Sequence, residues 1–373
     1  MENKYKTTIY PFDRDSVFFL RHNNLCSEYH FVHIVTLSGW GLSGKDASET
    51  DDGPVIGIKI EEDFENALMD CDTVLFVEPD TTIDIHQIIY SKLIKAANEQ
   101  KNIICAFPLK ENEKKNIACL CKQKNKMFRY LMDEQKKYSL LSKERIEEII
   151  TPVIFVGGIA ERTNKYEIQL SLRENIIKAG YKVAQVGTHN DCELMGFHSF
   201  PQFMFQKEFY EWEKISLFNH FIKSIEVNEK PDIILIGIPG GTLKMGQKFP
   251  NKCGILAYEI AQAVQPDVMI LGILYQKGID EKYLEELKTA HENRYGFRID
   301  CINVSNTMYN SSYSEKLEKL QYIMINYKYV IKETKKIKSL KTPVFQAFES
   351  NMGRNVSQLL IDKLVEYAED DRD

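Results

Sequence analysis

The sequence predicts an α/β protein with two doubly wound, mostly parallel sheets and a helical C-terminus. Short apolar runs alternate with helical patterns, the order that produces parallel strands joined by crossover helices. The alternation breaks near Thr151-Pro152 and starts again at Val153, and a chain of 373 residues is long enough for two domains. We therefore predict a Rossmann-like domain over 1–150, a second α/β domain over 151–335 and a helical extension over 336–373.

Each apolar run of the first half is interpreted as a strand, and strands are predicted at 7–11, 31–37, 55–60, 73–77 and 102–107. The periodic stretches between and after them predict helices at 14–25, 62–69, 86–100 and 127–150. Pro152 disfavours helix in the residue before it, which supports a boundary there. The lysine-rich stretch 110–126 is interpreted as a solvated face, with an anionic partner as the alternative.

The second half repeats the alternation. Strands are predicted at 153–156, 182–187, 232–238, 268–274 and 300–304. Helices are predicted at 166–179, 209–227, 256–264, 281–293 and 356–368, with Gly180 in the position of a C-terminal cap of the first.

Composition and charge exclude several function classes. The formal net charge of −6 argues against a nucleic-acid binder. No apolar run approaches the roughly 18 residues of a membrane span, and the N-terminus has no secretory pattern. The eight cysteines form no C-x-x-C pair, so we expect reduced thiols, a cytoplasmic location and no metal site. A homo-oligomer stays open.

The stretch from Gly157 to Tyr166 has the parts of a phosphate-binding loop. Gly157 and Gly158 follow an apolar run, Lys165 comes seven residues later, and a helical pattern follows. Such loops bind phosphate because main-chain N–H groups at a helix N-terminus point at the anion and a lysine adds charge. The stretch resembles the longer loop of dethiobiotin synthetase, G-x5-G-K-T, with Asn164 at the second glycine and Tyr166 at the threonine. Asn tolerates left-handed φ, whereas a tyrosine hydroxyl lies too far out to bind magnesium directly.

That resemblance extends to the strand at 232–238 and implies an acidic residue at its end, where this chain has Gly237. Gly240, Gly241 and Lys244 follow and are further candidates for nucleotide or phosphate contact. ATP with magnesium is the cofactor implied, and Glu161, Asp191 and Glu193 are the candidate catalytic or metal-binding acids nearby. Three interpretations stay open: a plain strand-to-helix turn, phosphate binding without efficient hydrolysis, and an ATP-using enzyme.

Two further loops carry candidate residues. Residues 39–44 fit G-x-G-x-x-G, but the polar segment that follows them does not predict the helix that a dinucleotide site requires. Gly41, Gly44, Lys45 and Asp46 are kept as a candidate ligand loop of the first domain. His189, Cys192 and His198 follow the end of a strand. They are interpreted as ordinary polar residues of a surface loop, with substrate contact and metal binding as the alternatives.

The stretches 10–13, 39–47, 72–77 and 158–165 together resemble the peptide maturation system proteins, a family encoded beside radical SAM enzymes in clusters for ribosomally made peptide natural products. A more distant resemblance is to the family of D-glutamate N-acetyltransferases, which implies a Rossmann-like domain followed by a P-loop domain. The first resemblance implies an accessory role in peptide maturation, with a precursor peptide or the maturation enzymes as partners. An ATP-dependent peptide-modifying enzyme and a non-catalytic scaffold are the alternatives.

Overall fold

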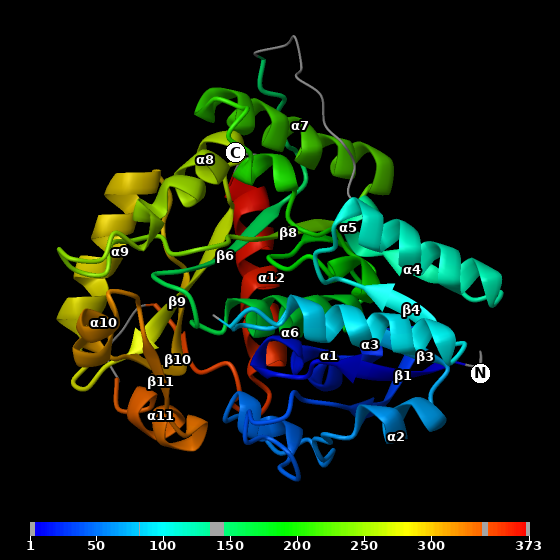
Figure 1. The fold of residues 1–373 in the computed structure, drawn as a ribbon. Helices are drawn as coiled ribbons and strands as arrows, with labels where there is room; N and C mark the ends of the chain where they lie inside the picture. The colour runs from blue at the N-terminus through cyan, green and yellow to red at the C-terminus, as the bar shows by residue number, and fades with distance from the viewer. Residues whose placement is uncertain (1–3, 82, 135–144, 338–341, 371–373) are drawn as a thin grey trace. The chain divides into compact units, whose positions relative to one another are not determined.

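The computed structural model describes residues 4–81, 83–134, 145–337 and 342–370. It divides into two compact units, the first comprising Met1–Lys136 with Asn190–Gly196 and the second Lys137–His189 with Phe197–Asp373 (Figure 1). Each unit is built on a largely parallel sheet with helices, so the chain has the two-domain α/β architecture that the sequence predicts.

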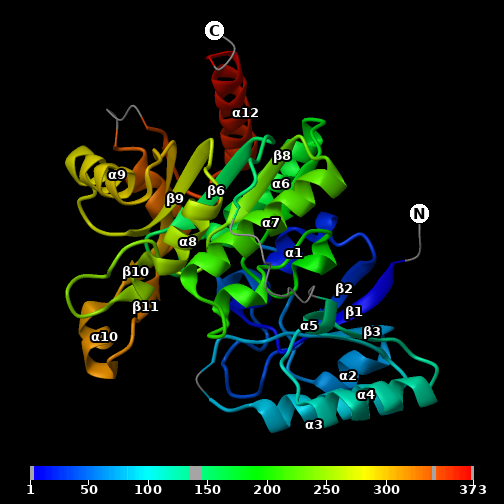
Figure 2. The same cartoon turned by 90° about the horizontal axis from the view of Figure 1, so that it is seen from above.

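The first unit contains a five-stranded parallel sheet with the order β2-β1-β3-β4-β5. This order is the flavodoxin-like variant of the doubly wound fold. Its strands are β1 (Tyr5–Tyr10), β2 (Tyr29–Ile34), β3 (Thr73–Phe76), β4 (Asn102–Cys105) and β5 (Phe128–Tyr130), and its α-helices are α1 (Phe18–Arg21), α2 (Phe64–Met69), α3 (His86–Asn98), α4 (Glu111–Gln123) and α5 (Leu131–Glu134). Helices α3 and α4 lie side by side against the sheet (Figure 2).

The region after β4 differs from the prediction of one helix over 127–150. Phe128–Tyr130 forms β5, because Phe128 and Tyr130 pair with Ile103 and Cys105 of β4. Within the predicted range only Leu131–Glu134 (α5) is helical among the described residues. A longer helix, α4, lies earlier in the lysine-rich stretch, where Ile117 and Cys121 are one turn apart and face the core. Residues 145–150 have no regular secondary structure, and 135–144 lie outside the described residues.

Two other elements of the first unit also differ from the predictions. The predicted helix 14–25 consists of α1 flanked by 3₁₀ turns at Arg14–Ser16 and Asn23–Leu25. Among the described residues, the predicted strand 55–60 makes one isolated β-bridge, between Lys59 and Asp46. The apolar residues of 55–60 follow the strand period, but Val55, Gly57 and Lys59 are exposed. Within the part of the chain that the structure describes, the segment forms main-chain hydrogen bonds only with the irregular residues 44–47, so no ladder of a sheet is built.

The second unit contains a larger sheet with the order β11-β10-β9-β6-β8-β7, and β12 pairs with β10. All pairs are parallel except β10 with β11. Its strands are β6 (Val153–Gly158), β7 (Val183–Val186), β8 (Ile233–Gly237), β9 (Val268–Tyr275), β10 (Cys301–Tyr309), β11 (Tyr322–Met324) and β12 (Val344–Phe345). Its α-helices are α6 (Lys165–Lys178), α7 (Glu211–Glu229), α8 (Ile255–Ala263), α9 (Glu281–Tyr295), α10 (Ser311–Leu317), α11 (Tyr327–Thr334) and α12 (Met352–Asp370).

Helices cover both faces of this sheet. Val153 and Phe155 of β6 pack in one core with α7, α8 and α9, whereas Ile154 and Val156 pack in another with α6 and α12 (Figure 1). Successive side chains of a strand point to opposite faces, so central strands that are buried on both sides appear in the sequence as continuous apolar runs. None of the helices in the described residues combines the length and apolar character that spanning a membrane requires.

Candidate functional site

The loop 158–165, from the last residue of β6 to the first residue of α6, lies at the topological switch point of the second sheet. From β6 the chain leads to β7 on one side, and from the adjacent β9 it leads to β10 on the other. Ligands of open α/β sheets bind outside the carboxyl ends of the strands at such a point. The Ile159 N–H donates to the Gly272 carbonyl of β9 at 2.9 Å, which holds the loop across this end of the sheet.

Glycines allow the main chain to pack closely around this loop. A Cβ on Gly158 would lie 2.1 Å from Thr163 Oγ1, and one on Gly241 would lie 2.7 Å from the Ile159 carbonyl oxygen. A Cβ on Gly157 would lie 2.7 Å from Met269 Cε. Gly240 adopts a left-handed φ of 77°. Each of these four glycines therefore occupies a position where a larger residue would strain or displace a neighbour.

Several main-chain donors of the loop have no partner among the described residues. Asn164 caps α6 in the left-handed conformation (φ 59°), the conformation that asparagine is expected to tolerate there. The N–H groups of Ala160, Glu161, Asn164 and Lys165 donate no hydrogen bond to any described residue. Unpaired N–H groups at a helix N-terminus form a concave site for an anion.

Lys165 lies inside this loop and is only 6% exposed. Its ammonium group donates to the Gly240 carbonyl oxygen and lies 3.4 Å from Glu161 Oε2. Burial lowers the pKa of Lys165, partly offset by the Glu161 carboxylate, and the Lys165 charge in turn lowers the pKa of Glu161. Glu161 is thus held as a carboxylate beside the lysine, where it acts as an internal counterion.

A second lysine, Lys252, approaches the same carboxylate. Its Nζ lies 3.8 Å from Glu161 Oε1, and a Cβ on Gly240 would lie 3.6 Å from its Cδ. The neighbouring Asn251 donates through Nδ2 to the carbonyls of Ile159 (2.7 Å) and Leu243 (2.6 Å), which fixes this turn to the loop. By contrast, the predicted Lys244 is exposed and forms no ion pair with any described residue.

Tyr166, the residue after the lysine, is nearly buried and stacks on His189 with ring centroids 4.0 Å apart and an interplanar angle of 23°. The stacking accounts for a tyrosine here, because the ring packs beside the end of β7. Asp191 and Glu193 belong to the first unit, in the segment Asn190–Gly196. Burial, the Glu193 carboxylate and Asp15 raise the pKa of Asp191 to about 8.

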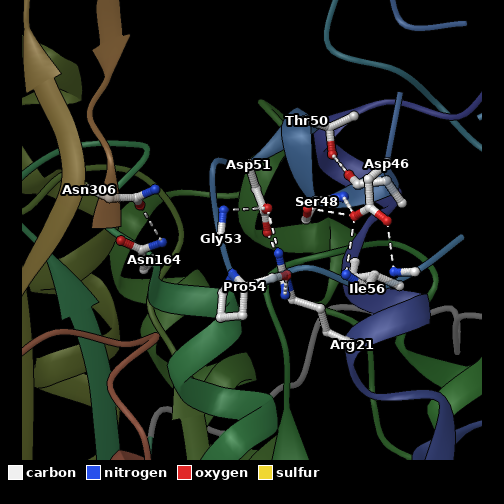
Figure 3. A network of polar contacts seen from close by, with 12 residues as sticks. Arg21, Asp46, Ser48, Thr50, Asp51, Gly53, Pro54, Ile56, Asn164 and Asn306 are labelled. Atoms are coloured by element: carbon white, nitrogen blue, oxygen red, sulfur yellow. Dashed lines mark hydrogen bonds and ion pairs between the residues drawn. The ribbon is translucent and has the colours of Figure 1, made fainter. Parts of the chain in front are cut away.

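Four residues that contact the loop were missed by sequence reasoning: Gln169, Asn251, Asn303 and Asn306. Asn303 Nδ2 donates to the Thr163 carbonyl at 3.0 Å, and Asn306 Oδ1 accepts from Asn164 Nδ2 at 3.2 Å (Figure 3). Asparagines inside the apolar stretch 299–304 and just after it were the available signal, since buried amides need partners.

The candidate loop of the first unit has a different character. Gly41 and Gly44 have left-handed φ values of 69° and 80°, and Lys45 is exposed. The carboxylate of Asp46 accepts hydrogen bonds from Ser48 N and Oγ, Ile56 N and Gly57 N (Figure 3). Asp46 caps the 3₁₀ turn Ala47–Thr50, not the α-helix that a dinucleotide fingerprint requires. Both carboxylate oxygens of Asp46 therefore accept hydrogen bonds from residues 48–57, which follow the glycines in the same segment.

A buried ion pair closes the same segment. The Arg21 guanidinium donates to both Asp51 oxygens at 2.7 Å and to the Pro54 carbonyl at 2.9 Å (Figure 3). The two side chains are 9% and 8% exposed. This bidentate pair ties the end of α1 to residues 51–54.

Among the described residues, no group of three or more His, Cys, Asp and Glu side chains is arranged to hold a metal ion. His198 instead pairs with Glu229, and Cys192 is buried.

Comparisons with known proteins establish the fold alone. The chain is similar to the crystal structure of a DUF1611 family protein from Anabaena variabilis, with a TM-score of 0.60 and 12% identity, covering 97% of this chain and 100% of that one. Chloroplast FtsY from Physcomitrella patens (TM-score 0.27, 11% identity, 61% of this chain and 75% of that one) is much less similar. The same holds for the signal recognition particle 54 kDa protein from Aeropyrum pernix (0.23, 14%, 76% and 63%), and TM-scores this low do not establish a shared fold.

No protein-family model matches the sequence, and no curated protein matches it.

Proposed function

We propose that the second unit binds the phosphate groups of a nucleotide or another phosphorylated ligand at the loop 158–165. The observation that carries this proposal is the set of four N–H groups around the buried Lys165 that donate to none of the residues the structure describes. Main-chain donors, the N-terminus of the 14-residue helix α6 and an ammonium group together favour an anion over a neutral ligand. The Glu161 carboxylate neutralises the charge of Lys165 until the anion takes the place of that carboxylate.

We further propose that this binding serves an accessory role in the maturation of a ribosomally made peptide, with the precursor peptide or a maturation enzyme as partner. The sequence resemblance described above supports this role. Binding without efficient hydrolysis is favoured over an ATP-dependent peptide-modifying enzyme, because Tyr166 and Gly237 supply no magnesium ligand. A non-catalytic scaffold would leave the loop without a ligand.

Thermal unfolding separates these possibilities. A ligand present at a hundred times its dissociation constant should stabilise the protein by ~2.7 kcal/mol. ATP, ADP, GTP and inorganic tripolyphosphate are the probes, and Lys165→Met removes the buried charge while keeping the length of the side chain. Lys178→Ala is the matched control, since Lys178 lies on the same helix with a 63% exposed side chain.

We expect stabilisation by at least one probe, loss of that stabilisation in Lys165→Met and its retention in Lys178→Ala. If no probe stabilises the wild type, the ligand-binding proposal fails and the scaffold remains. Steady phosphate release that disappears with Lys165→Met would favour the enzyme. Anisotropy of a labelled precursor peptide, measured with and without the nucleotide, tests the peptide partner separately.

A further inference from the structure

The groups that hold magnesium beside a phosphate-binding loop are replaced in this protein by groups that do not fit the ion. Magnesium is usually held by one or two carboxylates, with water and phosphate oxygens completing a strict octahedron. Here the strand next to the loop strand ends in Gly237, and the ring of Tyr166 stacks on His189. We infer that the loop binds its anion without magnesium, and that the ammonium groups of Lys165 and Lys252 supply the positive charge. This inference rests on the proposed function.

The space beside Gly237 is filled by the side chain of Gln169. A Cβ on Gly237 would lie 2.3 Å from Gln169 Oε1 and 2.6 Å from its Nε2. Gln169 is fully buried and donates through Nε2 to the Lys165 carbonyl at 3.2 Å. A carboxylate at position 237 therefore cannot enter unless Gln169 moves. Glycine at 237 and glutamine at 169 are a matched pair.

The Gln169 amide is also a poor substitute for that carboxylate. Its Oε1 is buried and has no hydrogen-bond partner among the described residues. A neutral amide oxygen lacks the charge that offsets the dehydration of magnesium. It can instead accept a hydrogen bond from a water molecule or from a protonated group of the ligand, which would satisfy an otherwise costly buried acceptor.

Positive charge is supplied by the chain itself. The Nζ atoms of Lys165 and Lys252 lie 3.4 Å and 3.8 Å from the two oxygens of Glu161, so two ammonium groups converge on one carboxylate. Lys252 is held there by a turn in which Asn251, Lys252, Cys253 and Gly254 all have left-handed φ values of 46–66°. A phosphate ester or polyphosphate that displaces Glu161 meets both lysines. The ligand class is therefore a metal-free di- or polyanion.

Isothermal titration of the full chain tests this directly. ATP and, separately, inorganic tripolyphosphate are titrated in EDTA and in excess magnesium at matched ionic strength. We expect binding in EDTA that is equal to or tighter than in magnesium, because the metal neutralises part of the ligand's charge. Affinity tenfold or more weaker in EDTA would overturn the inference and leave the proposed function standing. Absence of binding in both conditions would overturn the proposed function, and this inference with it.

Lys252→Ala tests the second cation. Its side chain is 73% exposed, so its removal should leave the fold intact. We expect affinity in EDTA to fall roughly tenfold, equivalent to ~1.4 kcal/mol. Lys244→Ala is the matched control from the same loop and should bind like the wild type. Equal affinities of the two variants would contradict the assignment of Lys252.

A pair of substitutions at the Gly237 position provides a structural readout. Gly237→Asp alone should lower the melting temperature, because its Cβ meets the Gln169 amide. Adding Gln169→Ala should recover part of that loss and create binding that magnesium strengthens. If Gly237→Asp is accommodated with no change in melting temperature, the two residues are not a matched pair and the packing argument against magnesium fails.

Discussion

The two glycine-rich loops of this protein, 39–46 in the first unit and 158–165 in the second, both follow a parallel strand but use their polar groups in opposite ways. In the first, Asp46 accepts four hydrogen bonds from its own surroundings. In the second, four main-chain N–H groups around a buried lysine have no partner within the described part of the chain. Glycine spacing alone does not identify a binding loop. What distinguishes the two loops is where their donors and acceptors find partners.

The largest effect is expected where the first segment is closed by its buried ion pair. Arg21→Ala leaves the Asp51 carboxylate buried without its guanidinium, which should cost about 3–5 kcal/mol in the free energy of unfolding. Urea denaturation followed by the fluorescence of Trp40, in a Trp212→Phe background, reports on this loop.

Lys6→Ala is the matched control, because its ion pair with Asp70 is exposed and should not change the denaturation midpoint measurably. Stability within 1 kcal/mol of the wild type in Arg21→Ala would mean that the pair does not hold the segment.

A smaller, pH-dependent effect is expected at Asp46. Partial burial raises the pKa of this carboxyl, but hydrogen bonds from Ser48, Ile56 and Gly57 together outweigh burial and lower the pKa below 3.8. A lowered folded-state pKa means that the stabilisation is present above the unfolded value and is lost as pH falls through the folded one. Asp46→Asn should therefore destabilise the protein at pH 7, and its deficit in free energy of unfolding should shrink below about pH 4. A deficit independent of pH would show that the charge of Asp46 does not matter.

The smallest effect is expected at the counterion of the second loop. Glu161→Gln removes the charge that competes with an incoming anion for Lys165 and Lys252. Affinity for tripolyphosphate in EDTA should rise roughly tenfold, or ~1.4 kcal/mol. Glu174→Gln serves as the control, because Glu174 lies further along α6 and forms an ion pair with Lys178, not with Lys165 or Lys252. Weaker binding in Glu161→Gln would instead make this carboxylate part of the ligand site.

The architecture was largely predictable because it depends on periodicity. Central strands such as 153–156 and 233–237 are apolar on both faces and were recognisable as such. The predictions failed where the local pattern was weak. Phe128–Tyr130 is too short for its period to be read, and its strand conformation depends on pairing with β4, a contact that the sequence does not display. Tertiary pairing overrides local propensity in such segments.

Within the candidate site, residues defined by the backbone were predictable and residues defined by packing were not. Gly158, Asn164 and Lys165 follow from loop geometry, since each meets a conformational or charge requirement of the loop. Gln169 carries no signal of its own, because its role depends on the missing side chain at Gly237, far away in sequence. Lys252 reaches the loop only through a left-handed turn, which its own sequence does not indicate.

Helix α12 has a consequence for how the second unit is made in the cell. Gly353 packs so closely on α6 that a Cβ there would lie 2.2 Å from Ser171 Oγ, and Leu360 and Leu364 help cover one face of the sheet. Chains emerge from the ribosome N-terminal part first. Until the last of these leucines has been translated, α6 alone covers its part of that face and the apolar surface under α12 stays exposed. This is the interval in which a chaperone could bind that surface.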